Sequence, residues 1–285
     1  MRFIALLLAA LQFSLVYGVP HLDISDLIRG GEPVYGKPEI VFFTHSGMNH
    51  PINGFFCGGT VLNKKYVLTA AHCTEVMTGE DMAKVTVHAG VTALYNYKNE
   101  GTQSSAIKSI IIHEKYNASS LENDIAIIEL ATEFRYTSTV KPVRIFLYDV
   151  LTELVPNQTV YIFGYGNTES HKGSNMDLRF VKVNVLNRDV CKKSYQNWLA
   201  KVTAESLCTY TKGKGSLEGD SGGPVFYRPE NGIPKDWEYW QVGIVSFGQH
   251  DRNGNAIEGS PDVNLRTSPY CTWISTNTNW TFLCS

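Results

Sequence analysis

The stretch Gly219-Asp220-Ser221-Gly222-Gly223-Pro224 carries the most specific signal in this sequence. Glycines on both sides of one serine permit a tight turn that leaves backbone N–H groups exposed. A serine held in such a turn is a candidate nucleophile. The full stretch is far more specific than a Gly-x-Ser-x-Gly match.

Two upstream stretches add candidate partners for this serine. The stretch from Cys57 to Cys73 predicts a pair of strands that delivers His72 beside a cysteine. Asp124 stands immediately before the apolar run 125–130, where a side chain at the start of a strand can be buried. Taken alone, each residue has an ordinary interpretation, His72 as an unremarkable histidine and Asp124 as a turn residue.

The pattern around these stretches predicts an all-β fold, a sandwich or a barrel. Helix signals are confined to residues 189–197 and to the C-terminal region around Trp273 and Ile274. Pro142 and Pro156 interrupt the strand pattern, so a boundary between two similar β halves is expected within 134–157. The predicted strands are 39–44, 65–69, 84–89, 105–113, 125–130, 159–164, 179–186, 224–227 and 240–247.

Composition excludes several classes of protein. Of the 285 residues, 43% are hydrophobic and only 18% are charged, which favours a folded core over disorder. The formal net charge of -2 gives no basic face of the kind that nucleic acid binding requires, so no nucleic acid partner is expected. The length suits one large all-β unit or about two domains.

The N-terminal residues 1–18 have the pattern of a secretory signal peptide, with Arg2 before an apolar run and a small residue at Gly18. That run is shorter than the ~20 apolar residues that span a bilayer, so a membrane anchor is the weaker alternative, and no membrane association is expected after removal. In an oxidising compartment the six cysteines are expected to pair, although their number allows many connectivities. Glycosylation sequons begin at Asn117, Asn157 and Asn279.

The order His72, Asp124, Ser221 and the stretches around these residues resemble the chymotrypsin-like (trypsin-fold) serine endopeptidases. The resemblance extends from Ile28 to the helix region around Ile274. It implies two six-stranded antiparallel Greek-key barrels with the active site between them and a C-terminal helix, within one protease domain over residues 28–285. The pocket pattern is most similar to crab collagenolytic and insect chymotrypsin-like proteases.

The resemblance implies a role for each residue of the three stretches. Ser221 would attack the peptide carbonyl, His72 would take up and return the proton, and Asp124 would orient the imidazole and stabilise its charged form. A serine hydroxyl needs such a base because it is a poor nucleophile near neutrality. The backbone N–H groups of Gly219 and Ser221 would form the oxyanion hole.

The resemblance also implies disulfide bonds. The expected pairs are Cys57–Cys73, Cys191–Cys208 and, from the two cysteines left over, Cys271–Cys284. The third pair departs from the family pattern. A continuous helix would place its two Cα atoms ~20 Å apart, whereas a disulfide needs ~7 Å or less. The chain is therefore expected to fold back after about Asn277.

Family members are stored as zymogens, and the mature start that resembles theirs here reads Ile28-Arg29-Gly30-Gly31. Cleavage would follow Leu27 and would define residues 19–27 as an activation propeptide. The new ammonium of Ile28 would pair with buried Asp220 and order the adjacent turn. Position 27 holds neither lysine nor arginine, so the expected activator is a protease that accepts leucine before the cleaved bond. This enzyme itself is one candidate.

Substrate preference is expected to depend on a pocket whose base, by resemblance, holds Gly215 and Ser216, where trypsins carry aspartate at the first position. Asp262 stands on the opposite wall, at a position usually held by glycine. This combination favours a broad or chymotrypsin-like preference over strict cleavage after arginine or lysine. The alternative for Asp262 is a solvated loop carboxylate. The backbone of Ser246-Phe247-Gly248 would pair with extended substrate as an added strand.

Two family features are absent from the sequence. Leu217 replaces the cysteine that precedes the serine turn, and residues 249–260 contain no partner, which predicts a looser pocket entrance. Val91 stands where calcium-binding members have a carboxylate, so no metal and no cofactor are expected.

A monomer is expected, with protein and peptide substrates and with protein protease inhibitors as further partners. Two alternatives stay open. One is a catalytically silent homologue that binds a partner through the same groove, and the other is a narrow processing protease.

Overall fold

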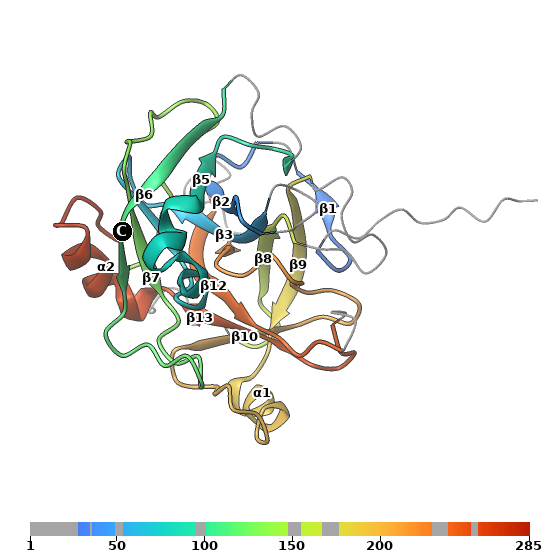
Figure 1. The fold of residues 1–285 in the computed structure, drawn as a ribbon. Coiled ribbons are helices and arrows are strands. Elements are labelled where there is room, and N and C mark those ends of the chain that lie inside the picture. The colour runs from blue at the N-terminus through green and yellow to red at the C-terminus, as the bar shows by residue number, and fades with distance from the viewer. Residues whose placement is uncertain are drawn as a thin grey trace, which may run out of the picture.

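The computed structural model describes residues 28–34, 36–48, 54–94, 101–147, 155–166, 177–229, 239–251 and 256–285. Two groups of strands lie side by side in Figure 1, the first coloured blue to green and the second mainly yellow to red. The predicted signal peptide, 1–18, and the predicted propeptide, 19–27, lie outside the described residues.

The first group is a closed antiparallel barrel with the strand order β2-β3-β4-β7-β6-β5. Every residue of β2 is buried, and this strand pairs with β3 on one side and β5 on the other. A Cβ atom at Gly59 would lie 2.8 Å from the Leu68 carbonyl oxygen, so glycine permits the close approach of β3 and β4. The strands are β2 (Ile40–His45), β3 (Phe55–Val61), β4 (Tyr66–Thr69), β5 (Val85–Ala89), β6 (Gln103–Ile112) and β7 (Ala126–Leu130).

The second group forms a second barrel, because β8 pairs with β9 and so closes the sheet order β9-β10-β13-β12-β11-β8. The two-residue strand β1 (Glu32–Pro33) is attached to the outer side of β9. Two six-stranded antiparallel barrels confirm the fold that the sequence predicts. The strands of this barrel are β8 (Thr159–Gly164), β9 (Arg179–Val185), β10 (Ser206–Tyr210), β11 (Pro224–Tyr227), β12 (Trp240–Phe247) and β13 (Asp262–Arg266).

The sequence pattern does not predict β10 and β13, because polar residues occupy positions that are buried in the barrel. Asp262 and Asn264 of β13 are both buried. The side-chain amide of Asn264 donates to the Leu207 carbonyl of the neighbouring strand at 3.0 Å, which satisfies a group that a pattern of hydrophobicity would assign to solvent.

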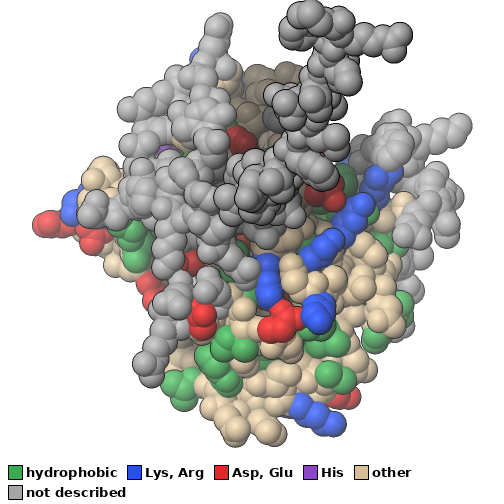
Figure 2. Space-filling view, turned by 90° about the vertical axis from the view of Figure 1, so that its right-hand side faces the viewer, with side chains coloured by type: hydrophobic (Ala, Val, Ile, Leu, Met, Phe, Trp, Pro, Cys, Tyr) green, Lys and Arg blue, Asp and Glu red, His purple; other side chains and the backbone are tan. Residues whose placement is uncertain are grey.

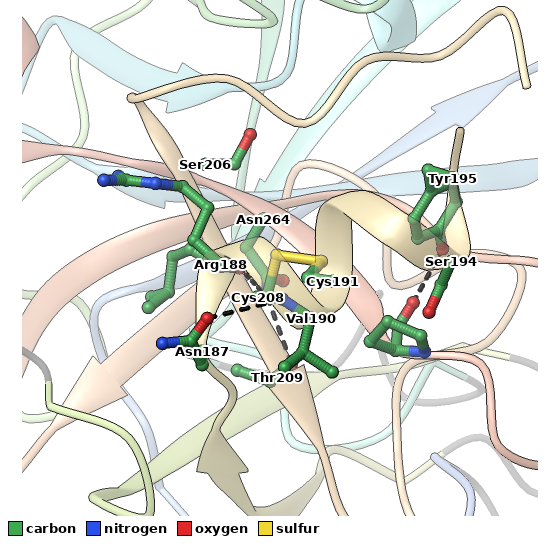
Figure 3. Close-up of a disulfide and its surroundings, with 12 residues drawn as sticks. Asn187, Arg188, Val190, Cys191, Ser194, Tyr195, Ser206, Cys208, Thr209 and Asn264 are labelled. Atoms are coloured by element: carbon green, nitrogen blue, oxygen red, sulfur yellow. Dashed lines mark hydrogen bonds between the residues drawn. A yellow bond between two sulfur atoms is a disulfide. The ribbon is translucent and has the colours of Figure 1, made fainter.

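Helix α1 (Arg188–Ser194) is shorter than the predicted 189–197. Asn187 caps it, since its side-chain oxygen accepts hydrogen bonds from the backbone N–H groups of Asp189 and Val190. Figure 3 shows the disulfide between Cys191 of α1 and Cys208 of β10, which attaches the helix to the second barrel. Beyond the helix, the Tyr195 hydroxyl donates to the Pro261 carbonyl at 2.6 Å, directly before β13.

The C-terminal helix α2 (Cys271–Asn277) follows the 3-10 turn η5 (Ser268–Tyr270) and packs on the first barrel through Ile274. Asn279 and Trp280 have φ values of 51° and 58°, left-handed conformations that turn the chain back. Cys284 therefore reaches Cys271, with 5.9 Å between Cα atoms, which confirms the third disulfide. The Cys57–Cys73 bond is also formed.

Strand β3 joins the two barrels by hydrogen bonds. The backbone N–H of Gly58 donates to the Ser221 carbonyl at 2.8 Å, and the Thr60 hydroxyl donates to the buried side chain of Gln241 at 2.8 Å. The chain passes from the first barrel to the second between the end of β7 and the start of β8. These contacts fix the serine turn of the second barrel against the first barrel.

Candidate active site

Neighbouring strands of the first barrel bring His72 and Asp124 together. In the pairing of β4 with β7, Thr69 lies opposite Ala126. His72 follows β4 and begins the 3-10 helix η1 (His72–Met77), while Asp124 precedes β7. The Nδ1 atom of His72 lies 2.7 Å from Oδ2 of Asp124, and the backbone N–H of His72 donates to Oδ1 at 2.8 Å. Because a carboxylate only accepts, Nδ1 carries the ring proton and Nε2 carries the lone pair.

The carboxylate of Asp124 is fully buried and is also held by the second barrel. The hydroxyl of Ser246, in β12, donates to its Oδ2 at 2.5 Å. Burial of His72 opposes protonation, but the adjacent Asp124 carboxylate outweighs this effect and raises the pKa of His72 above its ordinary value. The pair is therefore suited to accepting a proton on His72 and stabilising the resulting charge.

The turn that carries Ser221 depends on the glycines around it. Gly219 has φ +96°, and a Cβ atom there would lie 2.7 Å from the ring of Phe55. Gly222 has φ +76°, and its Cβ would lie 2.5 Å from the Gly58 carbonyl oxygen. Among the described residues, the backbone N–H groups of Gly219 and Ser221 donate to no acceptor. Two unused donors therefore flank the serine side chain.

A pocket of about 350 Å³ lies beside Ser221. Ser246 also lines it and donates to Asp124, which binds His72, so Ser246 links the pocket beside Ser221 to the His72–Asp124 pair. The sequence did not single out Glu218, Val245 and His250 as pocket residues, because each comes from a stretch with no motif of its own. The full lining is Ser216, Leu217, Glu218, Ser221, Val245, Ser246, Phe247, Gly248 and His250.

Gly215 and Asp262 do not line the pocket directly but lie behind its wall. Asp262 is 8% exposed on β13, which contradicts the alternative of a solvated loop carboxylate. Its Oδ2 accepts a hydrogen bond from the backbone N–H of Ser216 at 2.8 Å, and it lies 2.7 Å from where a Cβ of Gly215 would stand. Burial raises the pKa of Asp262 to about 6.

Asp220 is fully buried beneath the serine turn and accepts hydrogen bonds from two backbone N–H groups, those of Leu217 and Gly166, each at 2.8 Å. Burial raises its pKa to about 7. Ile28 is also fully buried, in the hydrophobic core of the second barrel. The next residue, Arg29, forms a backbone bridge with Gly215, so the start of the predicted mature chain lies beside Gly215, behind the wall of the pocket.

Within the described residues, the one grouping with the spacing of metal ligands is Cys57, His72 and Cys73. Its two sulfur atoms are joined in a disulfide and are therefore unavailable as thiolate ligands. On the face shown in Figure 2, Lys and Arg side chains lie next to Asp and Glu side chains, so the charge there is mixed in sign.

Comparison with known proteins places this site in a family. The trypsin family model matches residues 28–274, which include the serine turn, His72 and Asp124. The chain belongs to the trypsin family. It is therefore a serine endopeptidase that acts on protein substrates.

Proteins similar to this trypsin-family enzyme are named as trypsins, as a chymotrypsin or as venom serine proteases. Alkaline trypsin C of Manduca sexta is 34% identical over 284 residues, which cover 96% of this chain and 98% of the relative. Chymotrypsin-2 of Vespa crabro is 34% identical over 223 residues, 78% of this chain and 88% of the relative. A venom serine protease of Polistes dominula is 29% identical over 229 residues, 79% and 76% respectively.

Proposed function

We propose that this serine endopeptidase cleaves peptide bonds with His72, Asp124 and Ser221 after secretion and proteolytic maturation. The observation that carries the proposal is the hydrogen-bonded set in which Asp124 binds both His72 and Ser246, beside the glycine turn of Ser221. Both barrels contribute to it, so the site exists only when they are docked.

In this mechanism the Ser221 hydroxyl proton passes to Nε2 of His72 while Oγ bonds to the scissile carbonyl carbon. The carbonyl electron pair moves to its oxygen, which the N–H groups of Gly219 and Ser221 stabilise. Collapse breaks the C–N bond, and the leaving amine takes the proton from His72. Water then attacks the ester on Ser221 by the same proton route and releases the acid.

A fluorophosphonate probe tests the catalytic assignment on the matured enzyme. Labelling at Ser221, together with its loss in Ser221→Ala, supports the proposal. A protein with the mature terminus that neither labels nor cleaves peptides would overturn it and would favour the catalytically silent homologue.

Maturation is proposed to cut the Leu27–Ile28 bond. The new ammonium of Ile28 would neutralise Asp220, whose pKa is raised by burial and which, among the described residues, is held by backbone N–H groups only. N-terminal sequencing of the active form tests this, and a start other than Ile28 contradicts it. The Leu27→Lys variant makes this test sharper, because trypsin should then activate the chain while the mature terminus stays Ile28.

A broad or chymotrypsin-like preference, rather than strict cleavage after arginine or lysine, is proposed from Gly215 and Asp262. The Asp262 carboxylate lies behind Ser216 and accepts its backbone N–H, so it reaches a substrate cation less directly than a pocket-base aspartate would. Peptides with Arg, Leu, Phe or Tyr before the scissile bond test this in Asp262→Ala and Asp262→Asn. Unchanged profiles in both variants reject a pocket role.

Extracellular localisation is proposed from the signal-peptide pattern of residues 1–18. No helix of the described residues is long and apolar enough to span a membrane. The three sequon residues are exposed, at Asn117, Asn157 and Asn279, as glycan attachment requires. Recovery from the medium of expressing cells, with a mass shift after glycosidase treatment, tests secretion and glycosylation together, and retention inside the cells contradicts secretion.

A further inference from the structure

The pocket beside Ser221 contains a histidine that the catalytic mechanism does not use. His250 follows β12 by three residues and lines the pocket together with Ser216 and Glu218. Its Nε2 atom is buried, and none of the described residues offers it a hydrogen-bond partner. Buried polar atoms in native proteins are nearly always paired, so this nitrogen, which none of the described residues pairs, is a candidate contact for a bound substrate.

Gly248 lies close to this imidazole and to Asp262. A Cβ atom at position 248 would lie 3.9 Å from Nε2 of His250 and 3.0 Å from Oδ1 of Asp262. Gly248 itself lines the pocket. The space that a larger residue would fill therefore lies between an imidazole and a buried carboxylate, at the wall of the substrate pocket.

The charge of His250 restricts which groups can pair with it. Burial lowers its pKa below the ordinary value, against the opposing influence of Glu218, the Ser216 carbonyl and Asp251. At neutral pH the ring is neutral, with one nitrogen as donor and the other as acceptor. A hydroxyl group both donates and accepts, so it pairs with Nε2 in either tautomer. A carboxylate on the bound ligand would be repelled by the carboxylates of Glu218 and Asp262, so it is a less suitable partner for Nε2 than a hydroxyl group.

The apolar part of the same pocket favours an aromatic ring beneath that hydroxyl. Val245 and Phe247 line it alongside His250, within a volume of about 350 Å³. A phenol has this combination, an apolar ring that ends in a group able to donate and accept a hydrogen bond.

We propose that His250 is a specificity-determining residue that selects tyrosine over phenylalanine as the substrate residue before the scissile bond. Its Nε2 forms a hydrogen bond with the phenolic hydroxyl, while Val245 and Phe247 contact the ring. The inference rests on the proposed function, since it takes this pocket as the one that holds the side chain next to the bond attacked by Ser221.

Two peptides that differ only in tyrosine or phenylalanine before the scissile bond test the proposal on the activated enzyme. The ratio of their kcat/KM values is expected to favour tyrosine by about tenfold, the effect of one hydrogen bond at a buried site. In His250→Leu the ratio should fall to about one, because only the tyrosine substrate loses a hydrogen bond. His250→Gln keeps a donor and an acceptor and should recover part of the preference.

Ile257→Ala is the matched control, because Ile257 lies on the same connection between β12 and β13, is exposed and does not line the pocket. It should leave the ratio unchanged. Equal ratios in wild type and His250→Leu overturn the proposal, and so does a change confined to thermal stability. Failure of the labelled, matured wild type to cleave any peptide would contradict the proposed function instead, so the two failures are distinguishable.

Discussion

Asp124 and Asp220 are both fully buried, but their surroundings differ. Asp124 accepts hydrogen bonds from the ring and backbone N–H groups of His72 and from the hydroxyl of Ser246. Asp220 accepts its bonds from the backbone N–H groups of Leu217 and Gly166, and burial raises its pKa to about 7. The first carboxylate has a partner that can become positively charged, whereas the second has only amide donors among the described residues.

The comparison shows that two fully buried carboxyl groups can differ in the hydrogen-bond donors that surround them. Backbone N–H groups stabilise a carboxylate in part, but they do not fully replace the water that burial removes. In the proposed maturation, the site around Asp220 would receive the ammonium of Ile28, whose nitrogen is a peptide nitrogen before cleavage. The site around Asp124 needs no such addition.

Replacing Asp124 with asparagine should have the largest effect. The amide would no longer hold Nδ1–H of His72, so kcat should fall by about 10⁴-fold, a loss of the size known for trypsin-type triads. Steady-state peptide cleavage by the matured variant measures this. A melting temperature close to that of the wild type is the control, and a loss below tenfold would contradict the assignment.

Asp220→Asn should have the next largest effect, and only after maturation. Loss of the proposed pair with the Ile28 ammonium should reduce kcat/KM by about 100-fold, because a buried charge is left without its partner. Glu258→Gln is the comparison variant, since it removes the half-exposed partner of Arg29 and should change activity by no more than about fivefold. Equal effects of the two variants would refute the activation pair.

Ser246→Ala removes one of the three side-chain and backbone donors to Asp124. The remaining two bonds come from His72, so kcat should fall by about tenfold rather than be abolished. Ser246 also lines the pocket, and therefore kcat and KM should be measured separately. An unchanged kcat would show that the second barrel does not help to orient the carboxylate.

The smallest effect is expected in the pH dependence of melting of the uncleaved chain. The folded pKa of Asp220, about 7, lies above the unfolded value, so folding takes up a proton and stability is lost as the pH rises from about 4 through 7. Asp220→Asn removes this dependence and should melt a few degrees higher than the wild type at pH 8 but not at pH 4. In the matured enzyme, Asp220→Asn should instead melt at a lower temperature than the wild type at pH 8.

Local signals in the sequence were sufficient to predict much of the fold. Alternating or continuous apolar runs identified most strands of both barrels, and the turn glycines around Ser221 are required by their φ values. β10 and β13 were not predicted because they bury polar residues such as Asn264, whose side-chain N–H groups donate to the neighbouring strand. The third disulfide was predicted from the two cysteines left over by the pairs that the family resemblance implies. Helix geometry predicted only that the chain must fold back between Cys271 and Cys284.

The sequence by itself determined the serine turn, because the turn depends on residue types at fixed local spacing. The resemblance of the sequence to a known family supplied the candidate triad and the approximate extent of the protease domain. Only the tertiary structure decided that Ser246 donates to Asp124, that Asp262 lies behind Ser216, and that His250 lines the pocket. The physical reason is that hydrogen bonds and burial between distant segments follow from barrel docking, and no local pattern of residues specifies which side chains will face one another.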